Sequence, residues 1–315
     1  MTRIVNLEEI KEIVKTHDIS SFIEQGFEAY SKGLVIVPPV GELIFDDPPG
    51  DTHIKYGYIK NDDYFVIKIA SGFYENYKLD LPTGSGLMLL FSQKTGNLEC
   101  ILLDEGYLTD VRTALAGQIA AKYLAPKNVQ CIGVFGTGIQ ARMQVQYLEN
   151  LNSCRELAVW GRSEEKLKIY KHDMEALGYN VFISTNSAEV MNRSNLIITS
   201  TPAKEPLIQA NELNEGTHIT AMGSDTFDKQ ELDPKILSKA DIVCADSIKQ
   251  CLERGEICHA IKSSCIKQND VIEIGKIITN PSLGRTSEKQ ITVADLTGVA
   301  VQDVQIAKMV FSLLK

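Results

Sequence analysis

The chain has 315 residues, of which 44% are hydrophobic and 23% are charged, and its formal net charge is −9. This length indicates about two domains, and the ordinary composition excludes a disordered or fibrous protein. The acidic balance would repel a phosphate backbone, so we expect no nucleic-acid partner.

No apolar stretch reaches the length of a membrane-spanning helix, and the acidic start of the chain is unlike a signal peptide. The seven cysteines are an odd number in a chain without an export signal, which favours reduced thiols over a disulfide framework. We therefore expect a cytoplasmic protein with no membrane partner.

The first half of the chain predicts a mainly antiparallel sheet preceded by a helix over Leu7 to Gly26. Turn formers at 61–63 and 94–97 separate segments with strand character. These segments are Ile54 to Tyr58, Tyr64 to Ala70, Leu87 to Phe91 and Leu98 to Leu103. Thr109 is a candidate N-cap for a long helix that runs to Tyr123 and connects two domains.

From Val129 to Asp246, short apolar runs alternate with amphipathic stretches, which is typical of a doubly wound parallel sheet. Helices are expected over Ile139 to Leu151 and over Ser163 to Leu177, with Gly178 as a C-cap. The expected strands are Val129 to Phe135, Leu157 to Trp160, Val181 to Ser184, Leu196 to Ser200, His218 to Met222 and Ile242 to Ala245.

The final segment, Val299 to Leu314, has the pattern of another amphipathic helix. Its periodicity leaves open whether it returns to the first domain.

A glycine-rich loop follows the run that ends at Phe135. Residues 136–141 read Gly-Thr-Gly-Ile-Gln-Ala and fit the dinucleotide fingerprint, in which glycines let the backbone approach a pyrophosphate at a helix N-terminus. We predict that Gly136, Thr137 and Gly138 bind a dinucleotide. The alternative is a glycine turn in another α/β fold.

The end of the next expected strand carries Arg162 and Ser163 where an NAD-binding protein usually has an acid for the ribose hydroxyl. Both side chains suit a 2′-phosphate, so NADPH is favoured over NADH. The alternative is that Arg162 is a solvated surface residue and that Ser163 only caps the following helix.

Lys68 lies in the apolar strand segment 64–70. Because an unpaired buried ammonium is costly, Lys68 is expected to face a polar cleft or a fixed anion. An edge-strand lysine, or one that extends its ammonium to solvent, is the alternative.

Arg112 is the third residue after Thr109, which places a cation in the expected first helical turn, against the helix dipole. An anion bound at that helix end would reverse the unfavourable sign. Arg112 is therefore a candidate for holding a substrate carboxylate, with Asp110 as the alternative local partner.

Asp225 follows the expected strand that ends at Met222. Ligands of open α/β sheets bind beyond the carboxyl ends of the strands, so Asp225 is placed to meet a cofactor and its substrate. A turn or helix-cap role is the alternative.

Cys251, Cys258 and Cys265 recur every seven residues. Structural zinc usually requires pairs two to four residues apart, so we expect no metal site and interpret these cysteines as one buried helix face.

Five motifs, in the same order, resemble the ornithine cyclodeaminase/mu-crystallin family over nearly the whole chain. They are Val66 to Phe73, Leu108 to Ala114, Gly136 to Ala141, Gly216 to Asp225 with Lys229 to Pro234, and Asp295 to Val299. The resemblance implies an α/β protein, usually a homodimer. Its Rossmann-type domain, with a doubly wound parallel sheet, would span residues 118–298. A discontinuous α+β domain for substrate binding and dimerisation would comprise residues 1–117 and 299–315.

The resemblance also implies roles for single residues. Lys68 and Arg112 would bind the substrate carboxylate, with Thr83 beside substrate and cofactor, and Asp225 would be the catalytic acid/base. The cofactor contacts that it adds are Ile139, Gln140, Thr201, Thr220, Ala221, Met222, Gly223 and Lys229.

Two departures from the family narrow the choice of substrate. The family's first carboxylate-binding arginine falls at Gly41, next to Glu42, and the glutamate of ornithine cyclodeaminase falls at His53. Ornithine recognition is therefore disfavoured, since a basic side-chain amine would have lost its acidic partner.

The chain most resembles the bacterial Δ1-pyrroline-2-carboxylate reductases of the family. We accordingly expect reduction of a small cyclic imino acid, Δ1-pyrroline-2-carboxylate to L-proline, by NADPH or alternatively NADH. The other readings are an ornithine cyclodeaminase, an alanine dehydrogenase or acyclic imino acid reductase, and a non-catalytic protein that binds a ligand together with NADPH.

Overall fold

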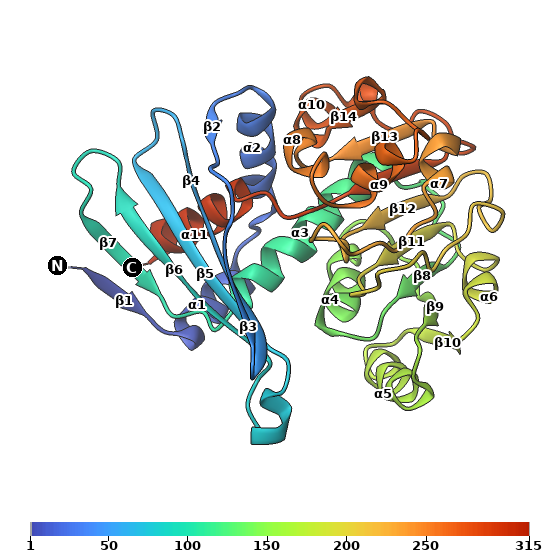
Figure 1. Cartoon of the computed structure of the whole chain (residues 1–315), viewed down its shortest axis with the longest axis horizontal. Helices are drawn as coiled ribbons and strands as arrows, with labels where there is room; N and C mark the ends of the chain where they lie inside the picture. Colours follow the sequence, from blue (N-terminus) through green and yellow to red (C-terminus); the bar gives the residue numbers. More distant parts are fainter. Residues whose placement is uncertain (1, 315) are drawn as a thin grey trace. The chain divides into compact units, whose positions relative to one another are not determined.

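The computed structural model describes residues 2–314, and the chain divides into two units (Figure 1). The first unit comprises residues 1–112 and 299–315, and the second comprises residues 113–298. The two ends of the chain therefore belong to the same unit.

The first unit contains a seven-stranded, mostly antiparallel sheet with the order β1-β7-β6-β5-β4-β2, and β3 pairs with β4. Within this sheet, β1 and β7 pair in parallel and the other pairs between described strands are antiparallel. The strands are β1 (Arg3–Val5), β2 (Val35–Ile36), β3 (Gly41–Asp46), β4 (Pro49–Ile59), β5 (Tyr64–Phe73), β6 (Gly84–Ser92) and β7 (Leu98–Leu102). The four strands expected in this region are confirmed, whereas β1, β2 and the mostly exposed β3 were missed.

The expected helix from Leu7 to Gly26 is wrong in one respect, because two helices occupy its place: α1 (Leu7–Thr16) and α2 (Ser20–Ser31). His17 is extended, and the carboxylate of Asp18 accepts hydrogen bonds from the backbone amide and hydroxyl of Ser20. These local bonds replace the helical ones and start a second helix.

The connecting helix α3 (Tyr107–Leu124) begins before the predicted cap. Asp104 accepts a hydrogen bond from the backbone amide of Leu108 at 2.9 Å, so Asp104 caps the helix and Thr109 lies inside its first turn. Arg112 consequently lies in the second turn, where the helix dipole opposes a cation less than predicted.

The final helix α11 (Val301–Leu313) packs against α2, β4 and β5 of the first unit, as Figure 1 shows with α11 in red. Most of its residues are buried, including the polar Gln302, Asp303 and Gln305. The expected helix is confirmed, and its packing answers the question that periodicity left open.

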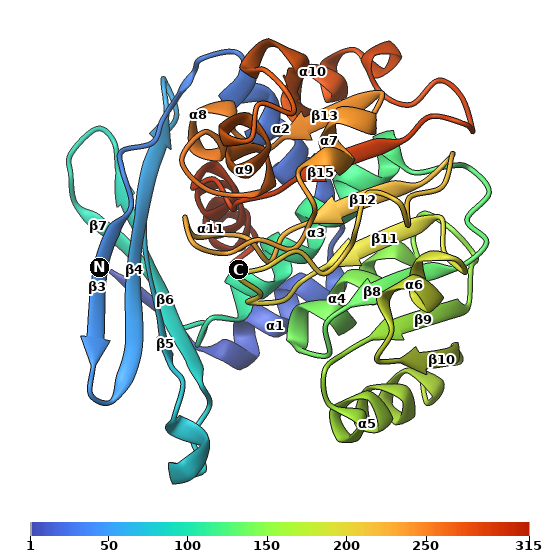
Figure 2. The ribbon, with the colours of Figure 1, turned by 45° about the vertical axis from the view of Figure 1, so that its right-hand side comes forward.

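The second unit contains an eight-stranded parallel sheet with the order β10-β9-β8-β11-β12-β15-β13-β14 (Figure 2). The strands are β8 (Ile132–Phe135), β9 (Glu156–Trp160), β10 (Asn180–Ser184), β11 (Leu196–Thr199), β12 (His218–Ala221), β13 (Ile242–Ala245), β14 (Val271–Glu273) and β15 (Thr292–Asp295). The six expected strands and the doubly wound α/β class are confirmed. Strands β14 and β15 lie beyond residue 246, where the expected alternation of apolar runs ends, and were missed.

Helices connect these strands, beginning with α4 (Ile139–Leu148) and α5 (Glu164–Glu175), both of which were expected. The shorter ones are α6 (Ser187–Met191), α7 (Lys235–Lys239), α8 (Ile248–Cys251), α9 (Glu256–Lys262) and α10 (Ile274–Thr279). The chain runs outward from β8 to β10 and then returns to place β11 on the other side of β8. Ligands of such sheets bind at this switch, outside the carboxyl ends of β8 and β11.

Candidate functional site

The glycine-rich loop joins β8 to α4, as the fingerprint predicts. Gly136 has φ +125°, and a Cβ there would lie 3.0 Å from the hydroxyl of Ser200, which follows β11. Only glycine suits both the backbone angle and this close approach. Gly138 is the N-cap of α4 without a side-chain capping bond, so the loop matches a backbone cradle for phosphate.

Arg142 braces this loop, and sequence reasoning missed it. Its guanidinium donates to the carbonyl oxygens of Thr137 at 2.5 Å and Gly138 at 3.2 Å, and it is paired with Asp173 at 2.6 Å. It also stacks over the ring of Tyr170. Arg142 therefore helps to fix the carbonyl oxygens of the loop at the start of α4.

A cavity of about 750 Å³ opens at the switch between β8 and β11, a volume within the range of ligand pockets. It is lined by the glycine loop, the end of β9 and residues 200–205, and the predicted cofactor residues that line it are Gly136, Thr137, Gly138, Arg162, Ser163 and Thr201. The predicted contacts outside its lining are Ile139, Gln140, Thr220, Ala221, Met222, Gly223 and Lys229.

Three side chains with hydrogen-bond donors gather at the carboxyl end of β9. Ser163 caps α5 by accepting a hydrogen bond from the amide of Lys166, as the alternative interpretation expected. It also lines the cavity. Arg162 and Lys166 line the same wall, and neither forms an ion pair within residues 2–314. Lys166, which the sequence analysis did not single out, adds a second cation to this wall.

Glu231 is fully buried and organises the ends of β11 and β12. It accepts four hydrogen bonds: from the hydroxyl of Thr199, from the amide and hydroxyl of Thr201, and from the amide of Gly223. Burial raises its pKa to about 7, although these donors act in the opposite direction. Thr201 and Gly223 are both predicted cofactor contacts, and Glu231 holds their backbones together.

The side chains of Thr220 and Ala221 point into the protein. Thr220 is buried and shares a hydrogen bond with the ring of His218, and Ala221 is fully buried. Ile139 at the start of α4 is 64% exposed, and Gln140 accepts a hydrogen bond from Gln144. Of these positions, Ile139 offers a side chain at the surface.

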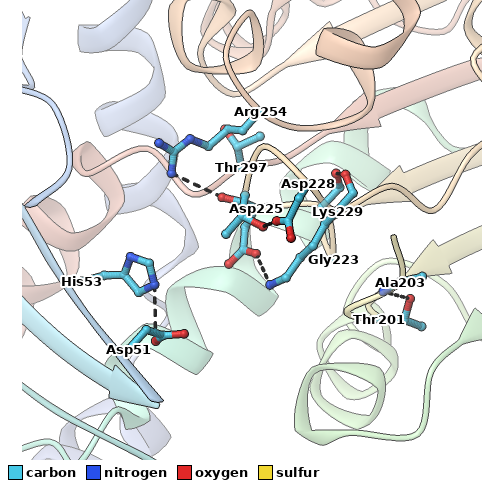
Figure 3. Close-up of polar contacts among 12 residues, drawn as sticks. Asp51, His53, Thr201, Ala203, Gly223, Asp225, Asp228, Lys229, Arg254 and Thr297 are labelled. Carbon is cyan, nitrogen blue, oxygen red and sulfur yellow. Dashed lines mark hydrogen bonds and ion pairs between the residues drawn. The ribbon is translucent and has the colours of Figure 1, made fainter. Parts of the chain in front are cut away.

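Asp225 lies in the loop after β12 and faces Lys229, as Figure 3 shows. Its carboxylate is 2.6 Å from the ammonium of Lys229, and Arg254 donates to its backbone carbonyl at 3.4 Å. Asp225 caps no helix, and its side chain is half exposed. The carboxylate is therefore accessible to a ligand that lies beyond the carboxyl end of β12.

Lys68 and Arg112 meet in the interior of the first unit. Lys68 lies on β5 and Arg112 on α3, and the carboxylate of Asp303 on α11 is 3.1 Å from the Lys68 ammonium and 3.2 Å from Nε of Arg112. The guanidinium of Arg112 also donates to Gln302. The expectation that Lys68 faces a fixed anion is therefore correct, but the partner suggested for Arg112, Asp110, is not the one observed.

Burial lowers the pKa of Lys68 to about 7, against the attraction of Asp303, and Arg112 lowers it further. Asp104 is also buried, which raises its pKa, while the charge of Lys68 lowers it. Nε of Arg112, the second oxygen of Asp303 and Oδ1 of Asp104 have no hydrogen-bond partner within residues 2–314. These groups form a charged interior that an added ligand could complete.

Thr83 is exposed beside the start of β6, and its carbonyl accepts a hydrogen bond from the amide of Phe73.

His53 does not stand apart from acidic groups. Its ring lies 3.4 Å from Asp51, an interaction that Figure 3 shows, and 3.7 Å from Glu42 on the paired strand β3. The region around His53 therefore keeps two acidic side chains, contrary to the expectation that it had lost its acidic partner.

Cys251 ends α8, Cys258 lies in α9 and Cys265 follows that helix, so the expectation of one helix face is wrong. Two short helices separated by a turn at Gly255 take its place. Within residues 2–314, no cluster of potential metal ligands occurs and no helix is long and apolar enough to cross a membrane.

Residues 1–315 match the ornithine cyclodeaminase/mu-crystallin family. An uncharacterised cyclodeaminase of Sinorhizobium fredii is 38% identical over 96% of this chain and 93% of its own length.

Two solved structures share the fold. An archaeal alanine dehydrogenase dimer with bound NAD superposes with a TM-score of 0.89 at 33% identity, covering 99% of this chain and 95% of that one. The Δ1-pyrroline-2-carboxylate reductase of Thermococcus litoralis, in complex with NADH and L-proline, superposes with a TM-score of 0.90 at 25% identity, covering 99% and 97%.

Proposed function

Since the chain belongs to the ornithine cyclodeaminase/mu-crystallin family, we propose that it reduces a small cyclic imino acid, Δ1-pyrroline-2-carboxylate, to L-proline with NADPH or NADH. The observation that carries the proposal is the buried pair of cations, Lys68 and Arg112, which lie 3.1 Å and 3.2 Å from the carboxylate of Asp303. Two neighbouring cationic donors suit a substrate carboxylate. The reductase whose structure includes L-proline supports the same substrate class.

The residues of this chain have separate roles in the proposed reaction. A bound nicotinamide cofactor supplies the hydride. Lys68 and Arg112 bind the carboxylate and fix the orientation of the C=N bond, which lowers the entropic part of the barrier. Asp225 would stabilise or supply the proton of the iminium, because a protonated imine is the better hydride acceptor.

The glycine loop fits a dinucleotide by its geometry. A Cβ at Gly136 would lie only 3.0 Å from the hydroxyl of Ser200, so the close turn requires glycine. No side chain caps the N-terminus of α4. Gly136, Thr137 and Gly138 would hold the pyrophosphate, and Thr201 the neighbouring part of the cofactor.

NADPH is the proposed preference because the end of β9 presents Arg162, Ser163 and Lys166 to the cavity. Two cations and a hydroxyl suit a 2′-phosphate. The two solved relatives contain NAD or NADH, so both cofactors belong in the assay.

Alanine dehydrogenase is the second candidate function. The archaeal alanine dehydrogenase is 33% identical to this chain, more than the 25% of the reductase of known structure. Pyruvate with ammonia would then be turned over faster than any cyclic imine.

The deciding experiment is a panel of imino and keto acids assayed by absorbance with NADPH and with NADH. Fastest turnover of Δ1-pyrroline-2-carboxylate supports the proposal, and fastest turnover of pyruvate with ammonia or of iminosuccinate overturns its substrate. Ammonia released from ornithine without net change in cofactor identifies a cyclodeaminase. No oxidation of cofactor with any substrate identifies a binding protein.

A homodimer is proposed from the dimeric alanine dehydrogenase relative. Sedimentation analysis tests it: a mass near twice 34.9 kDa supports the dimer, and a mass near 34.9 kDa overturns it.

A further inference from the structure

Asp303 is a buried acid in the interior of the first unit, and no motif of the sequence pointed to it. It lies in the first turn of α11 with its side chain 2% exposed. Its Oδ1 reaches Lys68 and Arg112 together, at 3.1 Å and 3.2 Å. The three residues come from a strand, a connecting helix and the final helix, so only the folded chain brings them together.

The two cations repel each other when no anion lies between them. Lys68 and Arg112 are 3% and 8% exposed, so water screens their repulsion poorly. A guanidinium is always charged in proteins, whereas a lysine can lose its proton on burial. Without the carboxylate of Asp303, Lys68 would therefore be the group that loses its proton.

We propose that Asp303 is a positioning residue that keeps Lys68 protonated and oriented beside Arg112, so that the pair is ready to bind the substrate carboxylate. This inference rests on the proposed function for its link to substrate binding. The interaction between Asp303 and Lys68 itself does not depend on it.

The charged groups around Lys68 define what the loss of Asp303 would do. Lys55, the register partner of Lys68 on β4, and Arg112 on α3 both lower the pKa of Lys68. Asp303 on α11 raises it, and Asp104, between β7 and α3, interacts with the same ammonium. With Asp303 present the pKa of Lys68 is about 7, so its loss would leave Lys68 mostly neutral at neutral pH.

The first experiment measures the binding of L-proline by calorimetry as a function of pH, with the protein saturated with oxidised cofactor. In the wild type, affinity should fall as the pH rises through the pKa of Lys68. In Asp303→Asn, the fall should move at least one pH unit lower, so that binding at pH 7.5 is about tenfold weaker, and the gap should narrow as the pH is lowered.

Asp62→Asn is the matched control, because Asp62 pairs with Lys308 on the same helix α11. It removes an acid partner of the helix and should leave the pH midpoint of binding unchanged. Asp303→Glu keeps the charge and should return the midpoint toward the wild-type value. An Asp303→Asn midpoint equal to that of the wild type would overturn the proposal.

A second experiment covers the case in which Asp303→Asn does not fold. Chemical denaturation is measured for the wild type, Asp303→Asn, Lys68→Met and the double variant. If Asp303 acts through Lys68, removing the lysine should relieve much of the damage, and the double variant should be more stable than Asp303→Asn. Additive losses, or a double variant that also fails to fold, would overturn the proposal.

The two hypotheses fail in different ways. A wild-type protein that neither reduces an imino acid nor binds L-proline contradicts the proposed function. The stability measurements on the four proteins would still decide whether Asp303 acts through Lys68.

Discussion

The two cation-rich regions of the molecule handle positive charge differently. Arg162 and Lys166 at the end of β9 line an open cavity without an ion-pair partner in the described chain, and Arg162 is exposed. Lys68 and Arg112 are buried, and they share the carboxylate of Asp303. Exposed cations are stabilised by water, whereas buried cations require a fixed anion. The first region therefore consists of residues close together in the sequence, whereas the second brings together residues from three distant segments.

Removing a buried cation should have the largest effect. Arg112→Ala leaves the carboxylate of Asp303 with one partner and removes a proposed substrate contact, so kcat/KM should fall at least about 100-fold, the scale of a broken buried pair. The cofactor dissociation constant should stay within about twofold. Steady-state kinetics and cofactor fluorescence titration measure the two quantities.

Arg155→Ala serves as the control, since Arg155 is an exposed arginine paired with Glu149. It should leave both constants nearly unchanged. Full turnover by Arg112→Ala would show that Arg112 does not bind substrate.

Closing the glycine loop should come next in size. In Gly136→Ala, the new Cβ lies 3.0 Å from Ser200 on a backbone with φ +125°, so the loop must shift. Cofactor affinity should fall by more than about tenfold, as expected for a displaced backbone cradle. Titration of the intrinsic fluorescence with NADPH measures it.

Gly96→Ala is the control, because Gly96 also has a positive φ but has open space around it. It separates the effect of backbone strain from the effect of a steric clash. Its effect should be limited to a small loss of stability. Unchanged cofactor affinity in Gly136→Ala would rule out this loop as the phosphate site.

The exposed cations should affect the choice of cofactor more than the rate. Arg162→Ala should lower kcat/KM with NADPH about tenfold and leave that with NADH nearly unchanged, because one charge-assisted contact to a 2′-phosphate is lost. Lys166→Ala should act in the same direction and less strongly. Lys168→Ala, an exposed lysine of α5 outside the cavity lining, is the control. Equal losses with both cofactors would contradict a 2′-phosphate site at β9.

The smallest expected effect concerns Glu231, whose burial raises its pKa to about 7 from the ordinary 4.5 of a glutamate. Between these values the folded state holds a proton that the unfolded state has released, so folding stability falls as the pH rises through this window. In Glu231→Gln this contribution disappears, and stability should depend less on pH between about 4.5 and 7. Denaturation curves at several pH values, compared with the wild type, measure the difference.

The same variant should weaken cofactor binding several-fold, because an amide cannot accept all four hydrogen bonds from Thr199, Thr201 and Gly223. A pH dependence identical to that of the wild type would show that Glu231 does not titrate in this range.

Local sequence was sufficient for the parallel sheet and the loop after β8. Short apolar runs predict buried strands, and the spacing of Gly136 and Gly138 predicts a loop whose backbone can approach a phosphate. Both features depend only on residues that are close together in the sequence. The helix starts were less reliable. The expected helix from residue 7 to 26 missed the break at His17 and Asp18, and the expected cap at Thr109 overlooked Asp104, because several polar residues near a helix start can serve as the cap.

The residues that sequence reasoning missed are mostly those that hold others in place. Glu231 accepts from the backbone of Thr201, and Arg142 donates to the backbone of Thr137. Such bonds between a side chain and a loop do not follow the repeat of a helix or a strand, so the sequence pattern gives no signal for them. A signal for Asp303 did exist, since an acid and two glutamines at 302–305 fall together in the first half of a mostly apolar final helix. Polar residues in such a helix deserve inspection as partners of a buried lysine.

By itself, the sequence determined the α/β class, the dinucleotide loop and the candidacy of Lys68 and Arg112, because each depends on residue type and on neighbours within a few positions. Only the tertiary structure decided that Asp303 lies between those two cations and that Glu231 ties the ends of β11 and β12 together. A buried charge must be balanced by whatever group the fold brings beside it, and that group can lie 235 residues away in the chain.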